Sequence, residues 1–80
     1  MKIGEACKLR IIELCKSYDI TINKLAIISG VTQSTLNNIV SGRNNSVTVS
    51  TLKKLCDGLD MSINDFFASD VFSELEQEIG

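Results

Sequence analysis

The sequence predicts an all-α protein, a compact bundle of five short helices whose C-terminal pattern allows a short sixth. Apolar residues recur three and four positions apart along most of the chain, which is the spacing of one helix face. Hydroxyl residues precede these runs as N-caps, and proline is absent from the 80 residues. The alternation in residues 46–50 is strand-like, but it is too short and lacks a partner.

The first expected helix covers residues 3–17. Its apolar stripe consists of Cys7, Ile11, Leu14, Cys15 and Tyr18. A second, short helix follows from a cap at Thr21 to Ser29, and it directs Leu25 and Ala26 toward the core.

Gly30 supplies the turn into the third helix, because glycine adopts a left-handed conformation without steric cost. Thr32 caps this helix, which runs to about Ser41 and is stopped by Gly42. The apolar residues of its inner face are Leu36, Ile39 and Val40, and the polar residues of the opposite arc are Gln33, Ser34, Asn37, Asn38 and Ser41.

Two further helices and a tail complete the chain. Thr48 caps a fourth helix, and Ser62 caps a fifth over residues 63–67. The apolar face of the fourth consists of Val49, Leu52, Leu55, Cys56 and Leu59, and that of the fifth of Ile63, Phe66 and Phe67. Beyond them, Val71, Phe72, Leu75 and Ile79 repeat at helical spacing with an acidic outer face. This last stripe either folds back on Phe66 and Phe67 or pairs with a second subunit.

Charge is segregated along the chain although the net charge is only −2. Residues 1–54 hold all eight bases and three acids, a balance of 8 − 3 = +5, whereas residues 55–80 hold seven acids and no base, a balance of −7. One end can therefore meet a polyanion while the other repels it, which favours nucleic-acid binding or simply reflects a solubilising acidic tail.

Cysteine and histidine usage argues against disulfides, metal binding and catalysis. The chain has three cysteines without a C-x-x-C pair and no histidine. We therefore expect no catalytic residue, no metal site and no cofactor, with Cys7, Cys15 and Cys56 as buried thiols. No apolar run approaches the roughly 20 residues needed to span a bilayer, so we expect a cytoplasmic protein without a membrane partner.

The outward arc of the third helix is made of short, uncharged polar residues, although these are mediocre helix formers. Base edges in the DNA major groove offer donors and acceptors, and Gln or Asn can match adenine with two hydrogen bonds. Glutamate would be repelled by phosphates, and a lysine-rich face would bind without selecting. Two short helices joined by a glycine turn, the second with a polar face, form a helix-turn-helix. The simpler interpretation, an ordinary solvated face, remains the alternative.

The stretches "LAIISGVTQSTLNNIVSG" and "TLKKLCDGLDMSINDFF" resemble the Cro/C1-type (XRE-like) helix-turn-helix domain of phage repressors, over about Ile11 to Phe67. The resemblance implies a five-helix domain that binds operator DNA as a dimer. It divides the chain into a helix-turn-helix domain, residues 1–68, and an acidic amphipathic extension, residues 69–80.

The resemblance also suggests which residues meet DNA. Its base-contacting residues are Gln33, Ser34, Asn37 and Asn38, and its phosphate-contacting residues are Thr32, Arg43, Asn44 and Asn45. The chain departs from the family pattern at Ile22, where a phosphate-gripping Gln is frequent, and at Val47, where Pro is common. Cys15 and Val40 stand where the family often pairs a base with a Glu, a joint replacement that can leave the fold intact.

These observations favour a sequence-specific transcriptional regulator of double-stranded DNA, expected to be a repressor and a homodimer on a palindromic operator. The alternative is a protein-interaction module that keeps the fold without DNA binding, such as an antitoxin or anti-repressor component with a protein partner. Ile22, Ile27 and Ile28 bear on this choice. Only some of them can face the core of so short a helix, and they either pack on the first helix, which we favour, or form a partner surface.

Overall fold

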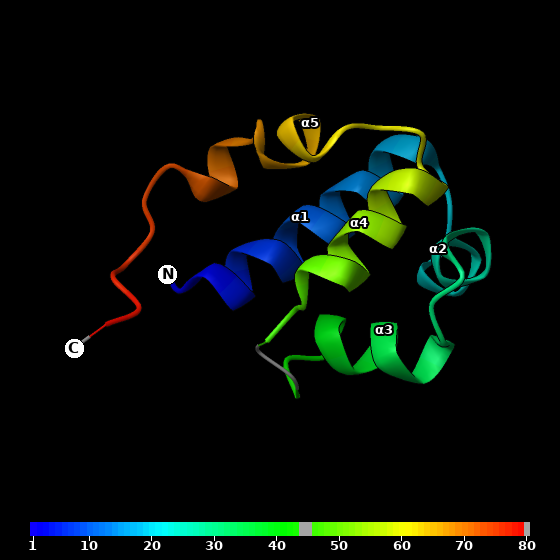
Figure 1. Cartoon of the computed structure of the whole chain (residues 1–80), viewed down its shortest axis with the longest axis horizontal. Helices are drawn as coiled ribbons and strands as arrows, with labels where there is room; N and C mark the ends of the chain where they lie inside the picture. The colour runs from blue at the N-terminus through cyan, green and yellow to red at the C-terminus, as the bar shows by residue number, and fades with distance from the viewer. Residues whose placement is uncertain (44–45, 80) are drawn as a thin grey trace.

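The computed structural model describes residues 1–43 and 46–79, and every described regular element is helical. The elements are α1 (Ile3–Tyr18), α2 (Ile22–Ser29), α3 (Gln33–Val40), α4 (Val49–Gly58), α5 (Ile63–Phe67) and a 3₁₀ turn, η1 (Asp70–Phe72). The prediction of an all-α chain with five short helices is confirmed (Figure 1). No helix in the described part of the chain is long and apolar enough to cross a membrane.

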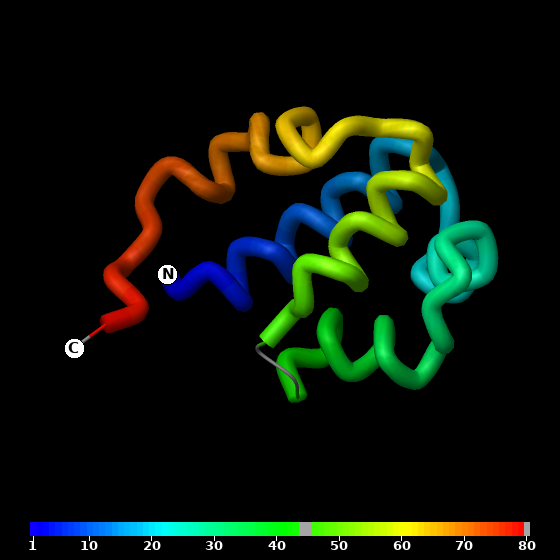
Figure 2. The backbone as a smooth tube through the Cα atoms, in the orientation of Figure 1, coloured from blue at the N-terminus to red at the C-terminus, as the bar shows by residue number. Residues whose placement is uncertain are grey.

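The helices form a small bundle with α3 along one edge. α1 and α4 run through the middle, α3 lies below them in Figure 1, and α5 lies above them. α2 packs against both α3 and α4, and α1 packs against α3. The tube in Figure 2 shows the C-terminal segment returning along the amino-terminal end of α1, so that both ends of the chain lie on one side.

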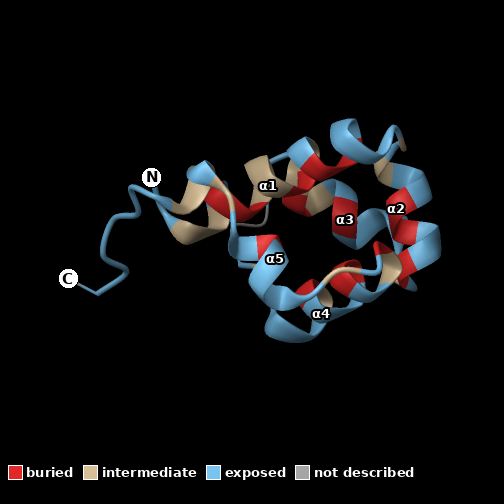
Figure 3. Ribbon diagram, turned by 90° about the horizontal axis from the view of Figure 1, so that it is seen from above, coloured by how far each residue is buried: buried red, intermediate tan, exposed pale blue. Residues whose placement is uncertain are grey.

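The core lies where the inner faces of α1 to α5 meet, as the buried segments of Figure 3 show. The buried side chains of its centre are Ile11, Leu25, Leu36, Leu55, Cys56 and Phe66. Each of them belongs to an apolar face that the helical spacing predicts. All three cysteines are buried and free, as expected, and burial raises the pKa of each thiol.

The predicted apolar faces are wrong at their ends. Tyr18 and Val49 lie at the correct angle on α1 and α4, but they are 46% and 76% exposed because each stands at a helix end beyond the core. Ile63 and Phe67 of α5 are also partly exposed, since so short a helix has room to bury only Phe66. Angular position alone does not bury a side chain; a neighbouring helix must also extend that far.

Of the three isoleucines of α2, only Ile22 packs as the preferred interpretation has it. Ile27 is 64% exposed and Ile28 is 40% exposed, whereas Ile22 is half-buried against the core. The buried residues of α2 are Leu25, Ala26 and Ser29. At about 100° per residue, Ile27 points away from that stripe and Ile28 lies beside it, so neither belongs to the buried face of α2.

The hydroxyl caps predicted from the sequence are formed. Thr21, Thr32, Thr48 and Ser62 each accept a hydrogen bond from a backbone N–H three residues later, at 3.0–3.1 Å. Gly30 and Gly42 adopt φ values of 69° and 83°, which explains glycine after α2 and α3.

The crossing of α2 and α4 holds the helix-turn-helix close to the core. Gly58 lies against Ser29, and a Cβ at position 58 would stand 2.2 Å from Ser29 Oγ. The absence of a side chain at Gly58 therefore permits the crossing. Ser29 Oγ is buried and makes no hydrogen bond within the described chain.

The tail forms the 3₁₀ turn η1 in place of a longer sixth helix. The ring of Phe72 packs against those of Phe66 and Phe67, with centroids 6.0 and 4.8 Å apart. Leu75 and Ile79 are exposed, so the predicted helical stripe does not continue past Phe72. After η1 the backbone turns to the start of α1, where Glu76 N donates to Met1 O at 3.0 Å in place of a helical hydrogen bond.

Candidate nucleic-acid interface

The turn between α2 and α3 fixes the direction of α3. Val31 N donates to Ala26 O at 3.0 Å and Gly30 N donates to Ile27 O at 3.3 Å, which closes the end of α2. Leu36 and Ile39 then attach α3 to the core with exposures of 0% and 2%. With its inner face held in this way, α3 presents its opposite arc outward.

The outward arc of α3 carries side chains without partners in their own chain. Gln33, Ser34 and Asn37 are exposed, and Asn38 is half-buried. Within the described residues, none of these four side chains makes a hydrogen bond, so their donors and acceptors are available to another molecule. The structure brings the four predicted base-contacting residues together on one helix face.

Thr32 differs from these four because its hydroxyl already has two local partners. It accepts from Thr35 N at 3.1 Å and donates to Thr35 Oγ1 at 2.7 Å. A hydroxyl has only one hydrogen to donate, so a phosphate contact requires that hydrogen to turn away from Thr35. The capping bond to Thr35 N can persist during that rotation.

The end of α3 carries a short polar chain that leads to Arg43. Ser41 Oγ donates to Asn38 O at 3.2 Å and accepts from Arg43 Nε at 3.2 Å. Arg43 is exposed, and its two terminal nitrogens make no hydrogen bond to a described residue. Its guanidinium is therefore positioned beside α3 with donors to spare. Asn44 and Asn45, the other predicted phosphate contacts of this loop, lie outside the described residues.

Two other bases have positions that the sequence does not reveal. A Cβ on Gly42 would lie 3.8 Å from Lys8 Nζ, so this lysine of α1 reaches the end of α3. Arg10 instead faces the opposite side of the bundle, where it donates to Phe66 O and Asp65 O at 2.6 and 2.8 Å. No sequence signal separates the two, because each contact joins residues more than 30 positions apart.

Lys53 of α4 is also engaged within the chain. It forms an ion pair and hydrogen bond with Asp57 one turn later, and this hydrogen bond raises the pKa of the lysine. Both groups are well exposed, so the pair is a feature of the surface.

The departures from the family pattern have a packing explanation. Cys15 is buried, and Val40 is half-buried against the core, so apolar packing occupies both positions of the missing ion pair. Ile22 packs against the core at the start of α2 and offers no polar group to a phosphate. Its neighbours Asn23 and Lys24 are exposed there.

A solved structure and a family model match this arrangement. The family model of the Cro/C1-type HTH DNA-binding domain matches residues 10–69, which is 60 of the 80 residues. The chain belongs to the Cro/C1-type helix-turn-helix family. The sequence-based assignment to this family is thereby confirmed.

The crystal structure of the prophage Lp1 protein 11 is similar to this Cro/C1-type chain throughout. The two share 36% identity with a TM-score of 0.79, over 94% of this chain and 100% of that one. No curated protein matches the chain. The similarity extends beyond the helix-turn-helix itself and includes most of the bundle around it, and the family assignment makes this chain a DNA-binding regulator in outline.

Proposed function

We propose that the protein is a sequence-specific repressor that inserts α3 into the major groove of double-stranded DNA. The observation that carries this proposal is the outward face of α3, where three exposed side chains and one half-buried side chain make no hydrogen bond to any described residue. A merely solvated helix gains stability from Glu and Lys pairs, which this face lacks. Unpaired amides and hydroxyls are suited to base edges.

The residues divide into two roles. Gln33, Ser34, Asn37 and Asn38 read bases, with the amide of Gln33 or Asn37 able to contact adenine through two hydrogen bonds. Thr32 and Arg43 contact the phosphates on either side of α3, together with Asn44 and Asn45. Phosphate contacts set register and affinity, whereas base contacts select sequence.

We further propose that the protein acts as a homodimer on a palindromic operator. Two recognition helices related by twofold symmetry reach successive major grooves when they stand about 34 Å apart. The α3 face of one copy is too small to cover more than one half-site. A dimer bound across a promoter would exclude polymerase, which is the basis of the repressor assignment.

Selection of bound sequences from a random duplex pool tests this proposal. We expect enrichment of a palindrome whose half-sites are centred about 10 base pairs apart. The matched control is the double variant Gln33→Ala/Asn37→Ala, which keeps the charge of the protein and should enrich no half-site. Enrichment of the same motif by both proteins would show that α3 does not read bases.

The alternative function is a protein-interaction module, and one observation favours it. Ile27 and Ile28 form an exposed apolar surface on α2, and the net charge of the chain is −2. If the pool yields no enriched sequence even at low salt, this alternative replaces the repressor proposal. An Ile27→Asp/Ile28→Asp variant that still selects the motif would remove α2 as a required partner surface.

A further inference from the structure

The acidic end of the chain lies on the amino-terminal end of α1. Lys2 Nζ donates to Gln77 O at 2.6 Å, and Ile3 N donates to a carboxylate oxygen of Glu78 at 3.3 Å. Glu76 N also donates to Met1 O at 3.0 Å, and the Glu76 carboxylate stands 3.1 Å from the amino group of Met1. Residues 74–78 therefore contact residues 1–3, at the start of α1, through both backbone and charge.

The contact of Glu78 has a clear physical basis. Lys2 is the N-cap of α1, but its side chain makes no capping bond, so the first N–H groups of the helix lack a local acceptor. The Glu78 carboxylate accepts from one of them, where the helix dipole favours negative charge. A phosphate oxygen has the same charge and the same hydrogen-bonding capacity.

The contact between residues 74–78 and the start of α1 lies at the protein surface. Every residue from 73 to 79 is exposed, and the apolar attachment of the tail ends at Phe72. Exposed ion pairs and hydrogen bonds of this kind contribute little stability and weaken with salt. Another anion can therefore displace residues 74–78 without unpacking the core.

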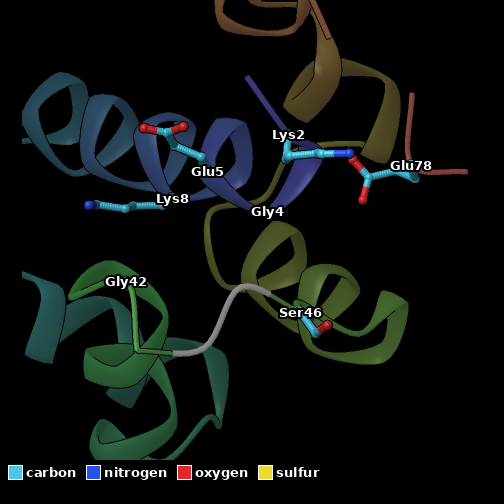
Figure 4. A pocket seen from close by; sticks show the side chains of 7 residues that line it. All are labelled: Lys2, Gly4, Glu5, Lys8, Gly42, Ser46 and Glu78. Carbon is cyan, nitrogen blue, oxygen red and sulfur yellow. The ribbon is translucent and has the colours of Figure 1, made fainter. Parts of the chain in front are cut away.

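The tail also lies next to the proposed DNA-binding edge. Glu78 shares a pocket of about 500 Å³ with Lys2 and Lys8 of the amino-terminal region and with Gly42 and Ser46 of the α3–α4 connection. In Figure 4 the side chain of Lys2 extends toward Glu78, while Gly42 and Ser46 lie across the pocket. Gly42 directly precedes Arg43, so Lys2 and Lys8 line the same pocket as the residue next to this proposed phosphate contact.

We propose that residues 74–78 form an acidic strap that competes with DNA phosphates for the amino-terminal end of α1. The strap occupies Lys2 and the N–H of Ile3, and its Glu78 lines the same pocket as Lys8 and Gly42. DNA binding then requires the strap to leave, which lowers affinity for every sequence alike. This inference rests on the proposed DNA-binding function, but it concerns affinity and leaves base choice unchanged.

The test compares two triple variants that remove the same charge. The strap variant is Glu74→Gln/Glu76→Gln/Glu78→Gln, which keeps the backbone hydrogen bonds of the tail. The control is Asp60→Asn/Asp65→Asn/Asp70→Asn, three exposed residues within or close to α5 in the sequence. In Figure 1, α5 lies on the other side of α1 and α4 from α3. Circular dichroism and thermal melting establish that both variants are folded.

Affinity for a labelled duplex of random sequence is measured between about 50 and 200 mM salt. We expect the strap variant to bind about tenfold more tightly than wild type at the lower salt, and the control to gain much less. The slope of log affinity against log salt should steepen by about one unit only in the strap variant, because one more phosphate contact forms. If both variants gain the same affinity, the gain comes from the change in net charge alone, and the proposal is overturned.

Lys2→Gln provides the second measurement. Lys2 donates to the backbone O of Gln77, a bond that the strap variant retains but that should open more readily once the three carboxylates are neutral. Lys2→Gln should therefore weaken DNA binding less in the wild-type protein than in the strap variant. In the control variant, Lys2→Gln should lower the affinity for DNA by the same factor as in the wild-type protein. If Lys2→Gln lowers the affinity equally in wild type, the strap variant and the control variant, the strap proposal is wrong.

The two proposals fail in different ways. If wild type selects an operator but the two triple variants bind random duplex equally well, the strap is wrong and the repressor assignment stands. If the strap variant alone binds random duplex but no protein selects a sequence, the strap is supported and sequence-specific repression is wrong. If neither wild type nor the strap variant binds duplex, both are overturned.

Discussion

The two arginines of this chain have opposite surroundings. Arg10 donates to Glu13 at 2.5 Å and to two carbonyls of α5, lies 6.0 Å from the centre of the Phe66 ring, and its side chain is only 12% exposed. Arg43 is exposed and, among the described residues, makes one hydrogen bond, to Ser41. The first region satisfies its polar groups internally, and the second leaves them open.

This difference separates the polar groups that stabilise this small domain from those that are available to bind another molecule. Around Arg10, charge and hydrogen bonding attach α5 to α1, and removal of the guanidinium takes one donor from each of two carbonyls and from the Glu13 carboxylate, which keeps its hydrogen bond from Ser69. Around α3, unpaired donors and acceptors contribute nothing to folding. The positive charge of residues 1–54 therefore overstates the number of bases available to DNA.

Arg10→Ala should have the largest effect on stability. We expect unfolding free energy to fall by about 2–4 kcal/mol, since several charge-assisted hydrogen bonds to a nearly buried side chain are lost together. Denaturant unfolding measures the change, with Arg10→Lys as the charge-preserving control that should recover only part of it. A variant as stable as wild type would contradict the structural role of Arg10.

Gln33→Ala should leave the stability of the protein almost unchanged but weaken its binding to the operator. We expect a loss of about 1–3 kcal/mol in binding free energy at the selected site, with relaxed preference at one base pair. Titration of the operator and of single-base variants by anisotropy measures both. Thr35→Ser provides a control on the same helix, and unchanged operator binding by Gln33→Ala would refute the base-reading role.

Arg43→Ala should weaken binding to all DNA duplexes by the same factor. Because a phosphate contact carries no sequence information, affinity for operator and random DNA should fall by the same factor, and the salt slope should flatten by about one unit. Unfolding free energy should change by less than about 0.5 kcal/mol, in contrast to Arg10→Ala. A selective loss at the operator would instead make Arg43 a base-contacting residue.

The substitution Glu13→Gln should have the smallest effect on stability, and that effect should depend on pH. Hydrogen bonds from Arg10 and Ser69 hold the pKa of this carboxyl below its ordinary value. A lowered folded pKa means that the stabilisation is present at neutral pH and disappears as pH falls through the folded value, below about pH 4.5. Because the carboxylate is largely exposed, Glu13→Gln should cost less than about 1 kcal/mol at pH 7. The two proteins should become equally stable in acid, and a constant difference across pH would exclude the titration of Glu13 as its cause.

Much of the fold follows from local sequence. The apolar spacing around each of Leu25, Leu36 and Leu55 predicts the buried face of one helix. The hydroxyls of Thr21 and Thr32 predict where two helices begin. These predictions succeed because helix periodicity and capping depend on residues within one turn. The polar face of α3 is predicted for the same reason, although its contact with DNA remains a prediction.

The errors arise where packing depends on distant parts of the chain. Tyr18, Val49, Ile27 and Ile28 are apolar residues in helices, but no neighbouring element extends far enough to bury them. The tail has helical spacing through Ile79, yet it ends its 3₁₀ turn at Phe72 because its next hydrogen bonds go to the start of α1.

The sequence alone determined the helices, their caps, the glycine turn before α3 and the family of this protein, since each depends on neighbours along the chain or on a contiguous motif. Only the tertiary structure decided which bases are free, that Arg10 serves α5 while Lys8 stands beside Gly42, and that Glu78 lies on α1. Those contacts join residues separated by 34 to 75 positions, and no local pattern encodes them.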